Sequence, residues 1–229
     1  MQQINQSNEN QNLLPCISGL FVGVLLLSNI LSSKMISIWG FSFDGGTLLF
    51  PLSYIFGDVL TEVYGYKASR RVIWTGFVML LIMSVNIYII SSLPSHEEWT
   101  MQKDFDNILF QMPRLAIASL IAYFVGEYTN SVVLSKMKVL TKGKHLWMRT
   151  IGSTLVGEGL DSAIFVLIAF TGLYSTSVLF NIMLSNYLFK TLIEVVFTPI
   201  TYKIISFVKQ KENLDVYDYN IQYNPLLGH

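Results

Sequence analysis

Seven ionisable residues fall inside long apolar stretches of this sequence. A charged side chain at the centre of a lipid bilayer costs about 2.5–3.5 kcal/mol on insertion scales, so such residues are kept where they face a polar interior or a water-filled cavity. There they can bind a polar solute, carry a proton or neutralise one another. The six carboxylates are Asp58, Glu62, Glu127, Glu158, Asp161 and Glu194, and the cation is Lys190.

Two of these carboxylates belong to a repeated motif. Residues 125–131 are Val-Gly-Glu-Tyr-Thr-Asn-Ser, and residues 156–162 are Val-Gly-Glu-Gly-Leu-Asp-Ser. In a helix, the Glu and the polar residue three positions later share a face, while the Gly lets a second backbone or a flat ligand approach closely. No cation lies near Glu158 or Asp161 in sequence. Substrate binding is therefore favoured for this pair, and also for Glu127 with Asn130.

The remaining ionisable residues each have two interpretations. Lys190 and Glu194 are four residues apart on one helical face, so they either neutralise each other or contribute to the site. Asp58 and Glu62 have the same spacing. They either contact a substrate or take part in coupling, or they act as structural partners of cations such as Arg70, Arg71 and Arg149.

Several kinds of catalytic chemistry have no motif in the sequence. There is no Walker lysine motif, no His-Glu-x-x-His pattern and no Gly-x-Ser-x-Gly elbow. The single Cys16 cannot form an intrachain disulfide, and the net charge of zero suggests no nucleic-acid partner. We therefore expect no enzyme activity, no metal and no cofactor.

The elements that carry these residues are long and apolar. Of the 229 residues 52% are hydrophobic and 13% charged, against about 25% charged in soluble domains. About 20 helical residues span a bilayer. The sequence thus predicts an all-α integral membrane protein with a bundle of six transmembrane helices, at residues 13–33, 45–64, 72–93, 115–135, 150–172 and 178–208.

The distribution of charge predicts the orientation. Lys and Arg gather after the second and fourth predicted helices and at the C-terminal end of the sixth, at residues 67–71, 136–149 and 203–211. Cytoplasmic loops retain such residues, so both termini are expected in the cytoplasm of a multi-pass protein of the plasma (inner) membrane. The expected parts are a disordered tail at 1–12, the transmembrane domain at 13–208 and a cytoplasmic tail at 209–229. A short interfacial helix is expected within the outer loop 94–113.

Depth along the predicted helices brings polar groups to one level. Glu127, Glu158, Asp161 and Lys190 all lie near the middle of their segments, and Asn29 lies in the outer half of the first segment. Transporters place their substrate sites near the bilayer midplane. We therefore expect Glu127, Glu158 and Asp161 to line one cavity together with Asn130.

Several stretches carry a family resemblance. The most specific is Phe50-Pro-Leu-Ser-Tyr-Ile-Phe-Gly-Asp-Val-Leu-Thr-Glu-Val-Tyr-Gly-Tyr, followed by Arg70-Arg-Val-Ile-Trp. Supporting stretches are Asn29-Ile-Leu-Ser-Ser-Lys34, Gly126-Glu-Tyr-Thr-Asn-Ser131, Leu146-Trp-Met-Arg-Thr-Ile-Gly-Ser-Thr154 and Gly157-Glu-Gly-Leu-Asp161. Over residues 20–208 the sequence resembles the queuosine precursor transporter family, also called the VUT family.

The resemblance implies import of a 7-deazaguanine for tRNA modification: 7-cyano-7-deazaguanine, its 7-aminomethyl analogue or queuine. The residue chemistry is compatible with this, because one carboxylate can accept the two adjacent N–H donors of a guanine-type edge. A cationic aminomethyl group would call for a second carboxylate. The candidates for apolar walls around the flat base are Phe50, Tyr54, Tyr123 and Phe165.

Two membrane functions remain open on this evidence. The first is a transporter that acts alone or as a homodimer in the lipid bilayer, driven by proton coupling or by metabolic trapping of its deazapurine. The alternative is the substrate-binding membrane subunit of an energy-coupling-factor-type importer for a nucleobase or vitamin, which requires ATPase partners. Such subunits are also six-helix bundles.

Overall fold

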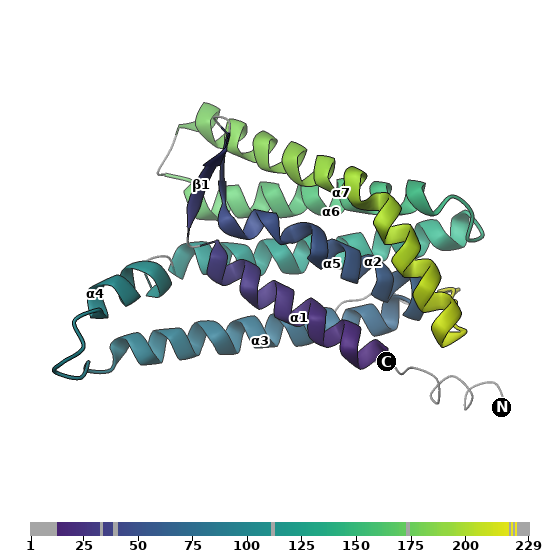
Figure 1. The fold of residues 1–229 in the computed structure, drawn as a ribbon. Coiled ribbons are helices and arrows are strands. Elements are labelled where there is room, and N and C mark those ends of the chain that lie inside the picture. The colour runs from purple at the N-terminus through teal and green to yellow at the C-terminus, as the bar shows by residue number, and fades with distance from the viewer. Residues whose placement is uncertain are drawn as a thin grey trace.

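Long helices dominate the computed structural model of this chain, which describes residues 13–32, 34–38, 41–110, 113–172, 175–219, 221 and 223. In Figure 1 the main helices run roughly along one common direction. The structure therefore has the expected α-helical core. In chain order its long helices are α1 (Leu14–Leu31), α2 (Phe50–Tyr64), α3 (Tyr66–Ser92), α5 (Pro113–Leu140), α6 (Leu146–Phe170) and α7 (Thr176–Glu212).

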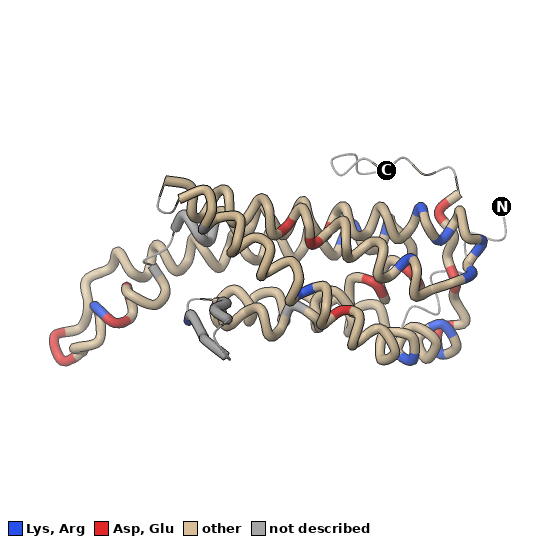
Figure 2. The backbone as a smooth tube through the Cα atoms, turned by 90° about the horizontal axis from the view of Figure 1, so that it is seen from above, with Lys and Arg blue, Asp and Glu red and all other residues tan. Residues whose placement is uncertain are grey.

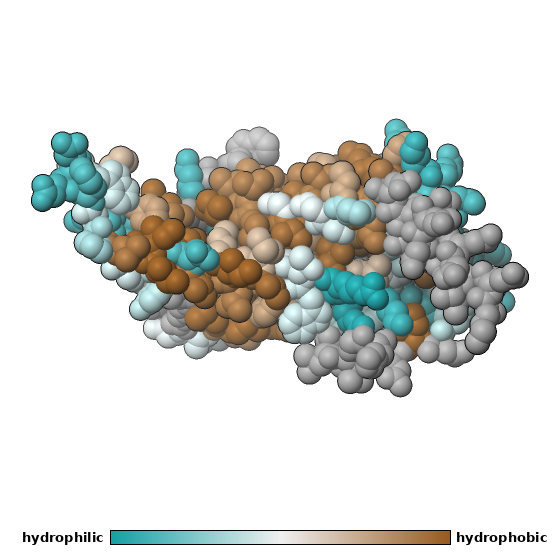
Figure 3. Space-filling view, turned by 90° about the horizontal axis from the view of Figure 1, so that it is seen from below, coloured by the Kyte–Doolittle hydropathy of each residue, from teal (hydrophilic) through white to brown (hydrophobic). Residues whose placement is uncertain are grey.

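Five of these helices, all except α2, are long and apolar enough to cross a membrane. Their exposed surfaces are rich in large apolar side chains such as Leu27, Ile89 and Val196, and apolar residues cover most of the middle of the face seen in Figure 3. Backbone groups bonded within helices and apolar side chains facing outward are what a lipid environment requires. The chain is thus a multi-pass α-helical membrane protein.

The second predicted span is shorter than expected. Residues 45–64 divide into the 3-10 helix η1 (Gly45–Leu48) and the 15-residue helix α2. At 1.5 Å per residue, α2 is about 22 Å long, which is less than the roughly 30 Å of a bilayer core. Its residues 57–64 are all buried. Because other helices enclose it, this part of α2 presents no face to lipid and can carry polar residues.

The connection between α1 and α2 contains an element that was not predicted. Strands β1 (Met35–Ile38) and β2 (Phe41–Asp44) pair antiparallel, with Met35 opposite Asp44 and Ile38 opposite Phe41. The strands are only four residues long, so they leave little periodic signal beside the long apolar runs. The all-α description therefore lacks this one short hairpin.

The two ends of the bundle differ in charge. The backbone N–H of Leu13 donates to Oε1 of Glu212 at 2.8 Å, so the start of α1 and the end of α7 share one end. Figure 2 shows most Lys and Arg residues toward this end and away from the α3–α5 connection. That connection contains the short helices α4 (Gln102–Phe105) and η2 (Asp106–Phe110), in the outer loop for which an interfacial helix was expected. By the positive-inside rule the basic end is the predicted cytoplasmic side.

Candidate functional site

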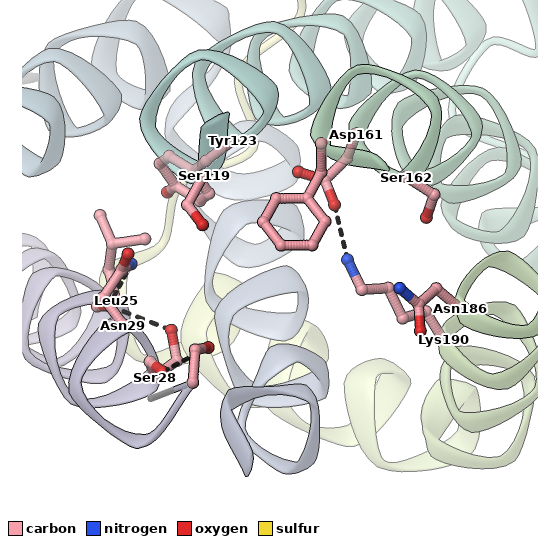
Figure 4. Close-up of a pocket in the computed structure, with 11 residues that line it drawn as sticks. Leu25, Ser28, Asn29, Ser119, Tyr123, Asp161, Ser162, Asn186 and Lys190 are labelled. Carbon is pink, nitrogen blue, oxygen red and sulfur yellow. Dashed lines mark hydrogen bonds and ion pairs between the residues drawn. The ribbon is translucent and has the colours of Figure 1, made fainter. Parts of the chain in front are cut away.

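A small polar pocket lies between α1, α5, α6 and α7 (Figure 4). Its volume of ≈ 30 Å³ is room for about one water molecule. It is lined by the second half of α1 and the first half of α5, so it lies in the half of the bundle nearer the hairpin. The lining residues are Leu25, Ser28, Asn29, Ser32, Ser119, Tyr123, Asp161, Ser162, Phe165, Asn186 and Lys190.

A buried ion pair joins α6 to α7 at the wall of the pocket. The Nζ of Lys190 lies 2.5 Å from Oδ2 of Asp161 and 3.2 Å from Oε2 of Glu158, and Figure 4 shows Lys190 pointing toward Asp161. All three side chains are at least nine-tenths buried. Two carboxylates and one ammonium give this group a net negative charge when all are ionised.

This ion pair differs from the local pairing considered for Lys190. Within the described part of the chain, both carboxylate oxygens of Glu194 lack a hydrogen-bond partner. A lysine that turns toward α6 meets two carboxylates, whereas Glu194 on its own helix offers one. The cation that Glu158 and Asp161 lack in sequence is therefore supplied by a neighbouring helix.

The predicted site residues occupy different depths. Asn29 and Asp161 line the pocket, and Glu158 is joined to it through Lys190. Glu127 and Asn130 are buried but are not among the lining residues. The amide of Asn29 donates to the carbonyl oxygen of Leu25 on its own helix, which leaves its Oδ1 available to a ligand.

Some lining residues were not singled out from the sequence. The hydroxyls of Ser28, Ser32, Ser119 and Ser162 are part of the wall. Serines are common in membrane helices, where they bond to their own backbone, as Ser28 does with Leu25. Their presence in a sequence therefore gives little sign of a site.

Only some of the aromatic residues predicted as walls for the base lie at the pocket. Tyr123 and Phe165 line the pocket, while Tyr54 does not line it but is buried beside the ion pair, where it hydrogen-bonds to Glu158. The side chain of Phe50 lies outside the described residues.

The repeated Gly-Glu motif marks the crossing of α5 and α6. A Cβ on Gly126 would lie 2.8 Å from Cβ of Asp161, and a Cβ on Gly157 would lie 2.9 Å from both Cβ of Asn130 and the carbonyl oxygen of Gly126. Gly126 on α5 therefore packs against Asp161, one turn after Gly157 on α6, and Gly157 packs against Asn130, one turn after Gly126. Of the two interpretations of these glycines, the structure favours close approach of a second backbone.

A second polar group lies on α2, α5 and α7. The Nδ2 of Asn130 donates to Oδ1 of Asp58 at 3.3 Å. Glu127 packs on α2 so closely that a Cβ on Gly57 would lie 2.0 Å from its Oε1. The electrostatic neighbours of Asp58 are Glu194 and Glu127, followed by Glu62 on its own helix.

Glu62 belongs to an ion network at the basic end. Arg149 donates to Oε2 of Glu62 through Nε at 2.8 Å and to Oε1 through Nη2 at 2.5 Å. Lys209 lies 2.8 Å from Oε1, and Lys138 donates to the backbone carbonyl of Glu62 at 2.5 Å. This geometry makes Arg149 the direct partner among the cations considered for Glu62. The network joins α2, α5, α6 and α7, so it ties four helices together at the basic end.

The chain beyond α7 packs on that end. The N–H of Val216 donates to the carbonyl of Val63 at 3.1 Å, and Asp218 accepts bonds from the N–H of Tyr66 and the hydroxyl of Ser135. Burial would raise the pKa of Asp215, but hydrogen bonds and charges from Lys138 and Lys209 hold that pKa below its ordinary value. The segment that follows α7 is therefore part of the seal of the basic end.

Comparison with known proteins finds a family profile and relatives that are all described as transporters. The profile of the family described as "Putative vitamin uptake transporter" matches residues 44–204. A "Probable queuosine precursor transporter" of Bacillus subtilis (strain 168) is 28% identical over 188 residues, which is 80% of this chain and 82% of the relative. The "Queuosine precursor transporter" of Escherichia coli (strain K12) is 29% identical over 177 residues, covering 76% and 77%.

A third relative from Haemophilus influenzae, also named "Probable queuosine precursor transporter", is 30% identical over 132 residues and covers 57% of this chain and 54% of its own length. No solved structure matches the chain.

Proposed function

Since the chain belongs to the putative vitamin uptake transporter family, we propose that it imports a queuosine precursor, a 7-deazaguanine base, across the plasma membrane. Three relatives carry that function in their names. The observation that carries the proposal is the buried group of Asp161, Glu158 and Lys190 beside the pocket. The basic end then faces the cytoplasm, and the pocket lies in the outer half of the membrane.

The charges of this group suit a guanine-type edge. Such an edge presents two adjacent N–H donors and a neighbouring carbonyl oxygen. A carboxylate accepts both donors at once, and we assign this role to Glu158 or to Glu127. Lys190 can donate to the carbonyl oxygen. The net negative charge also suits the cationic aminomethyl substituent, for which we propose Asp161.

The walls of the pocket suit a flat ring with polar atoms at its rim. Tyr123 and Phe165 supply aromatic surface, and Asn29 and Asn186 supply amides among several hydroxyls. Ligand sites commonly combine apolar walls with a few placed polar groups. These residues are thus suited to hold the ring between aromatic surfaces.

A bicyclic base is larger than the present pocket of ≈ 30 Å³, so binding requires the surrounding helices to separate. We propose that the base then moves deeper, toward Glu127 and Asn130. The ion network around Glu62 keeps the basic end closed during this step. Such an order of events corresponds to alternating access around a midplane site.

Uptake of labelled base tests the proposal. Cells that lack their own deazaguanine synthesis and this transporter should contain no queuosine in their tRNA when 7-cyano-7-deazaguanine is supplied at low concentration. Expression of the chain should restore both uptake and queuosine, whereas the Glu158→Gln and Asp161→Asn variants should restore less. Full-length protein in the membrane without any uptake of the cyano, aminomethyl or queuine bases would contradict the proposal.

A further inference from the structure

The polar group on α2, α5 and α7 has a chemistry that the substrate pocket does not explain. Its members Asp58, Glu127, Asn130 and Glu194 have exposures of 0%, 1%, 0% and 2%. Not one of the four lines the pocket. The group therefore has no direct access to the pocket in this conformation.

The atoms of this group that lack a partner are all acceptors. They are Oδ2 of Asp58, both Oε atoms of Glu127, Oδ1 of Asn130 and both Oε atoms of Glu194, counted over the described residues. Buried polar groups normally find a partner. Because every unpartnered atom here is an acceptor, the group is short of hydrogen-bond donors. A ligand that satisfies it must bring protons.

Three cations of the described helices are paired with other carboxylates. Lys190 is ion-paired to Asp161 and Glu158, and Arg149 and Lys209 are paired to Glu62. The carboxylate of Asp58 instead faces other carboxylates, Glu194 from α7 and Glu127 from α5, with Glu62 on its own helix.

Glu127 in turn faces Glu158 and Asp161 from α6. An ionised carboxylate in such surroundings is strongly disfavoured, and it becomes neutral by taking up a proton.

We propose that Asp58 and Glu194 form a proton-binding site, linked to Glu127 through Asn130, and that import of the base is coupled to proton entry. This inference rests on the proposed function and adds its energy source. Each step converts a carboxylate and a proton into a carboxylic acid and back, with no other bond changed. The protonated acids supply the O–H donors that the group lacks.

Three buried hydroxyls form a hydrogen-bonded cluster between this site and the basic end. Thr61 follows Asp58 by one turn of α2, and its hydroxyl lies 2.9 Å from that of Ser69 and 2.6 Å from that of Ser131. Ser69 and Ser131 are 2.7 Å apart, and all three residues are buried. Glu62 with its cations lies beyond them. When the basic end opens, water reaches Asp58 along these hydroxyls and the proton leaves to the cytoplasm.

The first test uses the unmodified protein. The full chain is reconstituted in liposomes, and addition of 7-cyano-7-deazaguanine outside should move protons inward, which a pH-sensitive dye in the lumen reports. An imposed gradient, acidic outside, should concentrate the labelled base inside, and an uncoupler should abolish this. Liposomes that exchange labelled for unlabelled base but show no proton movement would overturn this inference alone. Liposomes without any exchange would overturn the proposed function.

The second test separates proton coupling from substrate binding. Asp58→Asn and Glu194→Gln keep the size of the side chains but cannot cycle a proton. Both variants should still exchange base across the membrane, while gradient-driven accumulation falls to simple equilibration. The matched control is Asp104→Asn, an exposed carboxylate of the α4 region, which should accumulate base like the unmodified protein.

Two results would count against the inference here. One is accumulation at the unmodified level in both variants. The other is loss of exchange together with accumulation in properly folded variants, which would place these carboxylates in the substrate site. A variant that does not fold leaves the proton-movement experiment on the unmodified protein to decide.

Discussion

At the scale of single residues, the choice of ion-pair partner defines the site. Lys190 joins α7 to the two carboxylates of α6, although Glu194 is one turn away on its own helix. Burial makes this choice energetically important, because a buried charge without a partner is costly. The same choice leaves both carboxylate oxygens of Glu194 without a hydrogen-bond partner among the described residues.

The proposed roles of Glu158 and Asp161 predict different effects on two ligands. Glu158→Gln should weaken binding of both the cyano and the aminomethyl base by about 1.5–3 kcal/mol, roughly ten- to a hundredfold, because a charged hydrogen bond is lost. Asp161→Asn should weaken binding of the cationic aminomethyl base more than that of the neutral cyano base. Titration of purified variants with both ligands measures this. Equal affinity of all forms would move the site elsewhere, with Glu127 the next residue to test.

The ion pair of Lys190 predicts a pattern in a double-mutant cycle. Lys190→Met should lower the stability of the folded protein by up to about 3–5 kcal/mol, because two buried carboxylates lose their cation. Adding Asp161→Asn should recover part of that loss, while adding Glu194→Gln should give only the sum of the single effects. Thermal unfolding in detergent measures the three single variants and the two double variants. If adding Glu194→Gln recovers the lost stability instead, Lys190 pairs with Glu194 on its own helix.

At the scale of elements, the crossing of α5 and α6 positions the acidic residues. Gly126 and Gly157 bring the two backbones together, and this proximity sets Asn130 and Asp161 against the opposite helix. The crossing explains why both motifs contain a glycine directly before the glutamate.

Replacement of one glycine tests this geometry. Gly157→Ala should destabilise the protein by about 1–3 kcal/mol, since the new methyl group would overlap a backbone oxygen and Asn130. The matched control is Gly23→Ala in α1, where nothing lies within 4 Å of the added Cβ. The control should be neutral or stabilising by up to about 1 kcal/mol. Equal unfolding temperatures for the two variants would argue against a tight crossing.

At the scale of the whole molecule, the two halves of the bundle are packed differently. The basic end is sealed by the Glu62 network and by the segment after α7. The opposite half contains the pocket between α1 and the α6–α7 pair. This combination corresponds to a transporter closed toward its basic end.

Orientation in the membrane is tested by labelling single cysteines after Cys16→Ser. A cysteine at position 142, between α5 and α6, should react with an impermeant reagent only in inverted or permeabilised membranes. A cysteine at position 97, in the α3–α5 connection, should react from outside in intact cells. The positive-inside rule is the reason for both expectations. Reaction of position 142 in intact cells would reverse the assignment.

The sequence by itself determined the class of protein and the list of chemically important residues. Uncharged runs such as those of α1 and α3 are long enough to span a bilayer, and a charge within them is expensive enough to mark a polar interior. These are local properties, so Glu158, Asp161 and Lys190 could be selected without knowing which helices touch. Asn29 could be selected as a polar residue of the first span, and Tyr123 and Phe165 as aromatic walls for the flat base that the family resemblance implies.

Only the tertiary structure decided which residues meet. Helix rotation and packing order determine that Lys190 pairs with Asp161, that Arg149 pairs with Glu62 and that Asn130 bonds to Asp58. Sequence spacing gives neighbours within one helix, but contacts between helices depend on how all the helices fill space together. For the same reason only the structure shows that α2 is short and that its residues 57–64 are enclosed. The surrounding helices shield this part from lipid and allow its carboxylates to remain inside the bundle.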